Sequence, residues 1–342
     1  MSKTTFEYLA AVLRPVLEKE KTNFGTPINY RRRLAAANWW LATPCEYRTV
    51  STLFGMGIST ICYIIRDVCH GVNSLLFQRY ISLPSGARLD ETIEGFEVRG
   101  FPQCAGAIDV IYLFIRAYPN KSQYLCCCCS FTDIYIGWPG RTHDARVLSH
   151  SDVFLKAEDD QGGYLFPHEV NISSTYLFSQ KTLNFLLHKL IYFFFTEKPY
   201  DQRSGNPSLH NWRSCLHMYP FKNWLMKAFT NNHQLTRQQA HFNFRLSSAR
   251  MVVENAFGRL KGRWRRLLKR LDVETGFASD VVTTCCVLHS ICEIHKDQYD
   301  EAWDREWAEQ EAADRLQQPQ GIQDIGGNVP AGQIRNTIMN ML

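Results

Sequence analysis

The spacing of apolar and polar positions predicts helices in the first quarter of the chain. Apolar residues recur every three or four positions there, which is the period of an amphipathic helix. We predict one helix around Leu34–Leu41, a second at Tyr47–Phe54 and a third at Ser59–Val72, with a break at Gly55–Gly57. Two helices joined by a tight turn are typical of a helix-turn-helix motif.

In a helix-turn-helix motif, the second helix of the pair enters the major groove of DNA. Free backbone N–H groups at the N-terminus of that helix can bind a phosphate. Ser59 and Thr60 are residue types that suit the N-cap and first turn of such a helix. The candidate DNA contacts are Arg48, Ser59, Thr60, Tyr63 and Arg66. Helical hairpins are also common in proteins that never bind DNA, and that alternative stays open.

Two apolar runs in the middle of the chain predict strands. Ala105–Ile115 is apolar except for Asp109, as expected for a strand buried on both faces. A carboxylate in such a strand must be paired, hydrogen-bonded or bound to a metal, and a bond to backbone N–H groups is the ordinary alternative. Phe131–Trp138 predicts a second strand, which leads through a polar segment to Asp144 and a helix at Ala145–Leu148. A helix-capping aspartate is the ordinary interpretation of Asp144.

A second amphipathic pattern covers Arg250–Arg270 and predicts one helix over that range. Its apolar face consists of Val253, Phe257, Leu260, Trp264, Leu267 and Leu271. Its polar face sets eight cations, Arg250, Arg259, Lys261, Arg263, Arg265, Arg266, Lys269 and Arg270, against the single acid Glu254. A lone acid in a basic stripe suggests a metal ligand beside a polyanion, whereas a solvated charged surface is the ordinary alternative.

Composition narrows the class of protein. The chain has 342 residues, of which 45% are hydrophobic, so it can bury the cores of two domains. The longest apolar run, Leu183–Phe195, is interrupted by His188 and Lys189 and is shorter than a membrane helix, so we expect no membrane association. Twelve cysteines without a secretory signal favour reduced thiols.

Charge is distributed unevenly although the net charge is only +5. Two basic segments, Tyr30–Arg33 and Arg250–Arg270, are candidate nucleic-acid contacts. The acidic stretch Asp297–Asp314 opens a tail, 297–342, that we expect to be loosely ordered. Cys285, His289, Cys292 and His295 lie within one predicted helix at spacings that disfavour a zinc site.

Four blocks of sequence resemble the Harbinger family of transposases and the nucleases derived from them. They are GAID at 106–109, DIYIGWPGRTHDARVL at 133–148, YPFKNWLMK at 219–227 and HFNFRLSSARMVVENAFGRLKGRW at 241–264. The resemblance implies an α/β fold, a ribonuclease-H-like catalytic domain with a mixed sheet flanked by helices, preceded by the helix-turn-helix domain. It implies an N-terminal arm at 1–26, the helix-turn-helix at 27–80 and a DDE nuclease domain at 100–296.

The same resemblance implies that Asp109, Asp144 and Glu254 are catalytic metal ligands. Clustered carboxylates repel one another, and divalent cations neutralise them while gripping a phosphate. Hard oxygen ligands indicate Mg²⁺ or Mn²⁺. The DNA backbone would lie on Arg259, Lys261, Arg263, Arg265 and Arg266. We therefore expect DNA as substrate, a separate DNA-binding protein as a further partner, and a nuclear location with the cytoplasm as a second compartment.

The chain departs from the family pattern in three places. Val110–Tyr112 replace the Gly-Thr-His that follows the first acid, and the shortened stretch at 118–130 predicts the loss of a sheet strand. Cys215 and Leu216 replace a Gly-Asp pair, and leucine cannot bind metal. Residues 173–213 match nothing in the family, which suggests that the natural transcript differs there; Asp152 and Glu169 are candidate substitutes for the lost acid. A catalytically inactive DNA-binding or regulatory protein is therefore the alternative to a nuclease.

Overall fold

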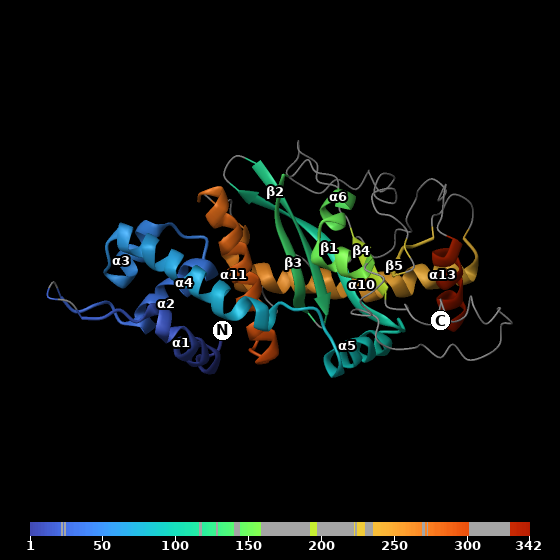
Figure 1. Cartoon of the computed structure of the whole chain (residues 1–342), viewed down its shortest axis with the longest axis horizontal. Helices are drawn as coiled ribbons and strands as arrows, with labels where there is room; N and C mark the ends of the chain where they lie inside the picture. Colours follow the sequence, from blue (N-terminus) through green and yellow to red (C-terminus); the bar gives the residue numbers. More distant parts are fainter. Residues whose placement is uncertain are drawn as a thin grey trace.

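The computed structural model describes residues 1–21, 23, 25–115, 118–127, 129–139, 144–158, 192–196, 222, 224–229, 235–268, 271, 273–300 and 329–342. A group of helices occupies one end of the molecule, a β-sheet lies in the middle, and the C-terminal helix lies at the other end (Figure 1). Side chains at 109–115, 118–128, 137–139, 144–145 and 192–196 lie outside the described residues.

The N-terminal helical group contains the predicted helix-turn-helix. It consists of α1 (Lys3–Leu17), α2 (Tyr30–Ala42), α3 (Tyr47–Phe54) and α4 (Ile58–Tyr80). Gly55 ends α3 in the left-handed conformation, with φ 57°, which glycine adopts at little cost. The axes of α3 and α4 differ by 101°, within the range of this motif. The boundaries of α3 confirm the prediction, but α4 begins at Ile58 with Gly57 as its N-cap, so Ser59 lies inside the first turn.

The central sheet has five strands in the order β3-β2-β1-β4-β5. The strands are β1 (Cys104–Ile115), β2 (Tyr118–Cys127), β3 (Ser130–Pro139), β4 (Tyr192–Thr196) and β5 (Leu225–Met226). β2 is antiparallel to both β1 and β3, whereas β4 is parallel to β1 and β5 is parallel to β4. The expected mixed sheet with strands near Ala105–Ile115 and Phe131–Trp138 is confirmed.

One expectation about this sheet was wrong. The stretch after Asp109 has not lost a strand, because Tyr118–Cys127 forms β2 and pairs with β1 along nine residues from Ala107 to Ile115. The segment 173–213, which matches nothing in the family, supplies β4 between β1 and β5. The rest of that segment lies outside the described residues. Aromatic residues favour strands, which accounts for β4, whereas β2 contains no β-branched residue and depends on its pairing with β1 and β3.

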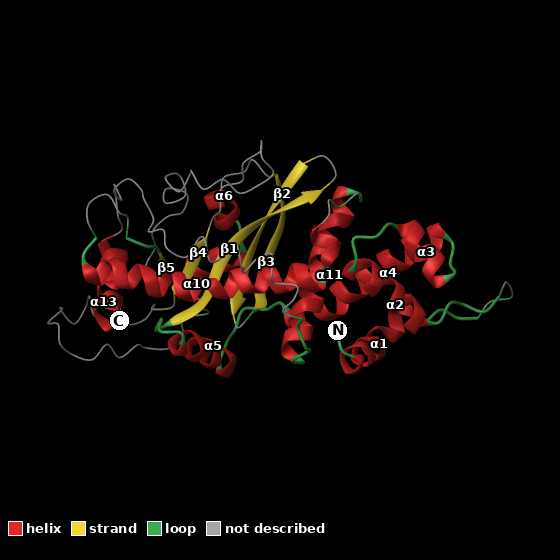
Figure 2. Ribbon diagram, turned by 180° about the vertical axis from the view of Figure 1, so that it is seen from behind, coloured by secondary structure: helices red, strands yellow, loops and turns green. Residues whose placement is uncertain are grey.

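Helices cover both faces of the sheet. On one face Ile108 packs with Leu148 of α6 (Asp144–Ser149) and with Val153 of α7 (Asp152–Glu158), and α5 (Ala87–Val98) adds Leu89 to this core. On the other face Ala107 belongs to the core built by α10 (Arg237–Arg263) and α11 (Thr275–Ile294). Figure 2 shows α10 running across the sheet. The result is a three-layer arrangement in which β1 is central.

Helix α11 joins the helical group to the sheet. Thr284 Oγ1 donates to Asn73 Oδ1 of α4 over 3.0 Å, and Ser290 Oγ accepts from the backbone N–H of Phe131 in β3 over 3.2 Å. The helix lies between α4 and the sheet in both views (Figures 1 and 2). Gly276–Ile294 is long and apolar enough to cross a membrane, but 72% of this window is buried inside the protein. Its apolar composition is that of a core helix.

Two predictions about the late helices need correction. The helix predicted to reach Arg270 ends at Arg263, because Trp264 leaves helical geometry at φ −112° and ψ 69°, and Arg265–Leu268 form a 3₁₀ turn, η1. All six predicted apolar-face residues are nevertheless buried. The tail was expected to be loosely ordered, but 329–341 form helix α13, which buries Ile334 and Ile338 against α10. Residues 301–328 lie outside the described residues.

Candidate metal site and nucleic-acid interface

Asp109 lies in the central strand of the sheet. Its register partners are Tyr124 in β2 and Thr196 in β4. Neither neighbouring strand therefore places a carboxylate directly beside position 109. The side chain of Asp109 lies outside the described residues.

Glu254 lies on α10, the helix that contacts β1, β2 and β4. Only 14% of its side chain is exposed. Arg250 Nη2 donates to Glu254 Oε1 over 2.9 Å, one helical turn away. The neighbouring residue Val253 is fully buried in the core beneath the sheet, which fixes the rotation of α10 at this point. A charged carboxylate in this partly buried position requires a cationic partner, and Arg250 supplies it.

Two further candidate acids, Asp144 and Asp152, begin the helices α6 and α7. Asp144 is the first residue of α6, as predicted for a strand-to-helix turn, and its side chain lies outside the described residues. Asp152 begins α7 and is exposed. Glu169 and Leu216 lie outside the described residues, so their predicted roles are untested.

Asp133 is a titratable residue that sequence analysis overlooked. Burial in β3 raises the pKa of its carboxyl to about 6, the nearby Asp152 raises it further, and Lys156 and the backbone N–H groups of Ile134 and Val153 oppose the rise. Among the described residues, its Oδ2 atom has no hydrogen-bond partner. Tyr124 of β2 pairs with Asp109 of β1 on one side and with Ile134 of β3 on the other. Asp133 is therefore one residue out of line with Asp109 across the sheet. The sequence signal that could have identified Asp133 is that it is the acid within the predicted strand Phe131–Trp138.

Two of the predicted DNA-contacting arginines on α10 bind an acid of the chain. Arg259 donates to Glu293 at distances of 2.8 to 3.1 Å, and Arg263 Nη2 donates to the same carboxylate over 3.0 Å. The side chain of Arg263 is 2% exposed, whereas that of Arg259 is 28% exposed. Tyr299 stacks against the Arg259 guanidinium at 4.4 Å. The prediction for Arg263 is corrected, because its side chain connects α10 to α11 and does not reach the surface.

Arg266 also has a structural position. It is buried, its Nη1 donates to the carbonyl of Cys45 over 2.9 Å, and its guanidinium lies 4.3 Å from the ring centre of Trp40. Its contacts join η1 to the corner between α2 and α3. Arg265 beside it is exposed, and Lys261 is partly exposed. The basic stripe of the sequence is therefore divided into inward-facing and outward-facing cations.

The helix-turn-helix surface keeps most of its predicted contacts accessible. Arg48 and Ser59 are exposed, Thr60 is partly exposed, and Tyr63 is 70% exposed. Arg66 instead reaches α11, with Nη2 3.6 Å from Glu274 and the guanidinium 4.4 Å from the centre of the Phe277 ring. This side chain is still 43% exposed.

Within the described part of the chain, no three His, Cys, Asp or Glu side chains gather closely enough to hold a metal ion. His289 donates from Nε2 to the carbonyl of Cys129 over 2.8 Å, and burial lowers its pKa to about 4. Burial likewise raises the pKa of the Cys292 thiol to about 12. Both side chains are therefore neutral packing residues at neutral pH.

Comparisons with known proteins support part of the expected family. Residues 121–290 match the family described as DDE superfamily endonuclease, a range that contains Asp144 and Glu254 and begins after Asp109. The chain is 24% identical over 316 residues to the Arabidopsis thaliana protein named "Antagonist of like heterochromatin protein 1", which covers 85% of this chain and 70% of the relative. No solved structure matches. Residues 121–290 are thus similar to a DDE superfamily endonuclease domain, in a chain related along most of its length to this plant protein.

Proposed function

We propose that the protein is a transposase-derived, divalent-metal-dependent DNA nuclease of the Harbinger type with a ribonuclease-H-like catalytic domain. The observation that carries this proposal is the sheet order β3-β2-β1-β4-β5, in which β2 alone runs antiparallel, with an acid in the central strand and Glu254 on the helix packed across the sheet. The match of residues 121–290 to DDE superfamily endonucleases supports the same assignment.

Asp109, Asp144 and Glu254 are the residues that would hold the metal. Their donor set fits Mg²⁺ or Mn²⁺, because both prefer carboxylate oxygens. Glu254 fits such a role, since it is a largely buried carboxylate that, among the described residues, pairs with the cation Arg250. The ion, when bound, would supply positive charge for a phosphate and for the attacking oxygen.

The outward-facing cations and the helix-turn-helix would hold the DNA. Arg265, Lys261 and the more exposed part of Arg259 belong to this surface, together with Arg48, Ser59, Thr60 and Tyr63 of the helical group. Arg266 connects η1 to the α2–α3 corner, so the two groups of residues belong to adjoining elements. Contacts of this kind to phosphates are sequence-independent and weaken with salt.

A catalytically inactive DNA-binding or regulatory protein is the second candidate. The register of the sheet favours it, because Thr196 and not an acid lies beside Asp109 in β4. The loss of the Gly-Asp pair at Cys215–Leu216 favours it too. The plant relative is named as an antagonist of another protein, like heterochromatin protein 1, and by analogy we propose for this chain a protein partner in addition to DNA, and a nuclear location.

Cleavage of supercoiled plasmid by the purified full chain, in Mg²⁺ or Mn²⁺, tests the proposal. We expect nicking that is abolished in Asp109→Ala and Glu254→Ala and retained in Glu18→Ala, which removes an exposed acid of α1. Nicking that survives both active-site substitutions would show contaminating nuclease and reject the assignment. Salt-sensitive DNA binding without nicking would instead establish the inactive alternative.

A further inference from the structure

The ion pair between Arg250 and Glu254 is unusually sheltered for a pair within one helix. Their side chains are 22% and 14% exposed. Arg14 and Glu18 form a pair of the same spacing and direction on α1, with exposures of 58% and 49%. The exposed pair is screened by water and contributes little to stability. In the sheltered pair, each charge depends on the other for its solvation.

Arg250 also has unused hydrogen-bonding capacity. Nη2 contacts Glu254, whereas Nε is buried and has no hydrogen-bond partner within the described residues. Buried N–H donors in proteins are usually satisfied, so this one calls for an acceptor beyond the described residues. A phosphate oxygen is the kind of acceptor that a guanidinium fork binds best.

We propose that Arg250 is a positioning residue that holds the carboxylate of Glu254 in the metal-free protein and competes with the divalent cation for it. The inference rests on the proposed function, because it takes Glu254 as a metal ligand. When the cation takes over the carboxylate, the guanidinium becomes available to a phosphate oxygen of the substrate. One side chain thus balances the charge of Glu254 before DNA and metal arrive and contacts the phosphate afterwards.

The competition follows from elementary electrostatics. A guanidinium within hydrogen-bonding distance of a metal ligand repels the incoming cation, and the carboxylate must exchange one positive partner for another. Removing the guanidinium charge should therefore strengthen metal binding, even though it removes a stabilising contact. A purely structural role for Arg250 predicts the opposite, because a less well-positioned Glu254 would bind metal more weakly.

Calorimetric titration of Mn²⁺ into the full chain, without DNA, distinguishes these outcomes. We expect Arg250→Gln to lower the Mn²⁺ dissociation constant about tenfold. Arg250→Lys retains the charge and should remain within about twofold of the wild type. Arg14→Gln, the matched control, removes the exposed pair and should leave the constant unchanged. If Arg250→Gln does not fold, Arg250→Met preserves the length of the side chain and serves the same test.

The same Mn²⁺ titration in a chain that also carries Glu254→Gln completes the experiment. The effect of Arg250→Gln should disappear there, since the competition acts through that carboxylate. Unchanged or weaker Mn²⁺ binding by folded Arg250→Gln would overturn the inference while leaving the metal site in place. Absence of Mn²⁺ binding by the wild type would instead reject the proposed function, and the inference with it.

Discussion

Arg263 Nη2 donates a hydrogen bond to Glu293 Oε1 over 3.0 Å, with 2% of the arginine side chain and 12% of the glutamate side chain exposed. The same Arg263 nitrogen donates to the carbonyl of Asp297 over 3.0 Å. Asp297 in turn accepts hydrogen bonds from Ser2 and Thr5 at the start of α1. A cation that the sequence placed in a DNA-binding stripe therefore connects α10, the end of α11 and the N-terminus of the chain.

Arg263→Ala should destabilise the protein by roughly 3–5 kcal/mol, because it leaves the largely buried Glu293 carboxylate with fewer compensating donors. Arg265→Ala removes an exposed cation two residues away and should change stability by less than about 0.5 kcal/mol. Urea denaturation followed by circular dichroism measures both. Equal free energies of unfolding for the two variants would contradict the assignment of Arg263 to packing.

Substitutions of Arg265 and of its neighbour Arg266 should have different effects on DNA binding. Arg265→Gln is expected to weaken binding of a duplex and to reduce the slope of log K against log salt by about 0.9, the value for one lost phosphate contact. Arg266→Gln should lower the stability of the protein and leave that slope unchanged, because the side chain is buried against Trp40. Fluorescence anisotropy at several salt concentrations gives the slopes. A smaller slope for folded Arg266→Gln would show that this side chain reaches DNA.

His289 should make the fold sensitive to acid. Its pKa is about 4 in the folded protein, below the ordinary value of 6.5, so the unfolded chain binds more protons between these pH values. The contribution of this residue to the free energy of unfolding is fully present above pH 6.5. As the pH falls from 6.5 toward 4, about 3 kcal/mol of stability is lost. His289→Gln should flatten this part of the stability profile, measured by urea denaturation between pH 4 and 7. A profile as steep as that of the wild type would assign the acid sensitivity to other groups.

Asp133 should give the stability of the protein a pH dependence opposite to that from His289. Burial raises its pKa to about 6 from the ordinary 3.8, so the folded protein binds the extra proton and its stability falls as the pH rises from about 4 to 6. Asp133→Asn should remove this dependence and melt higher than the wild type at pH 7.5. Thermal unfolding at pH 4 and 7.5 tests this. A lower melting temperature at pH 7.5 would show that the backbone bonds to the carboxylate outweigh its desolvation.

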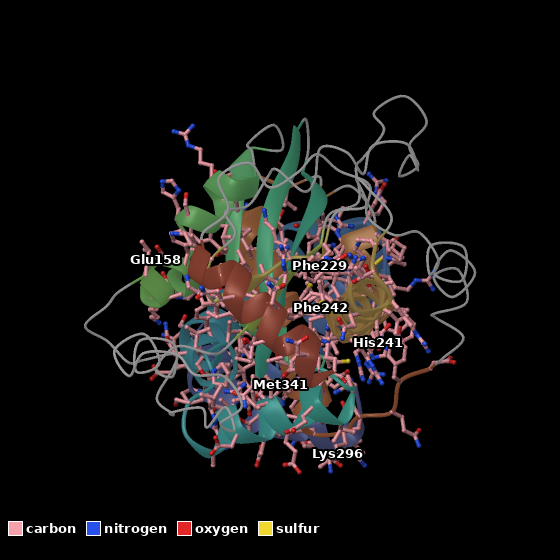
Figure 3. All side chains as sticks on the ribbon, turned by 90° about the vertical axis from the view of Figure 1, so that its right-hand side faces the viewer. Glu158, Phe229, His241, Phe242, Lys296 and Met341 are labelled. Atoms are coloured by element: carbon pink, nitrogen blue, oxygen red, sulfur yellow. The ribbon has the colours of Figure 1, made fainter. Side chains whose placement is uncertain are left out.

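Helix α13 should contribute to the stability of the core around α10. Ile338 is 2% exposed, and Arg335 lies 4.0 Å from the centre of the Phe229 ring, which packs in turn on Phe242 (Figure 3). Ile338→Ala should cost about 2–5 kcal/mol of unfolding free energy. Met341→Ala, at a position 53% exposed, should cost less than about 1 kcal/mol. Equal, small losses in a denaturant series would indicate that α13 does not stay docked on α10.

Local patterns allowed several elements to be predicted well. The turn at Gly55–Gly57 requires a left-handed residue, and the spacing of apolar positions from Val253 to Leu271 places all of them in the core. The apolar run of β1 identified a central strand because both of its faces are covered. β2 and β4 were not predicted, because strand pairing depends on distant partners and not on the local sequence.

The sequence by itself determined the helix-turn-helix turn, the central strand with its acid and the amphipathic helix that carries Glu254, since backbone preference and hydrophobic period are local properties. Only the tertiary structure decided which cations face inward. Arg259, Arg263 and Arg265 follow one another in the same basic stripe, yet a partner from α11 binds the first two, while the end of α10 turns the third outward. Charge can be counted along a chain, but the acid that meets each arginine comes from elsewhere in the fold.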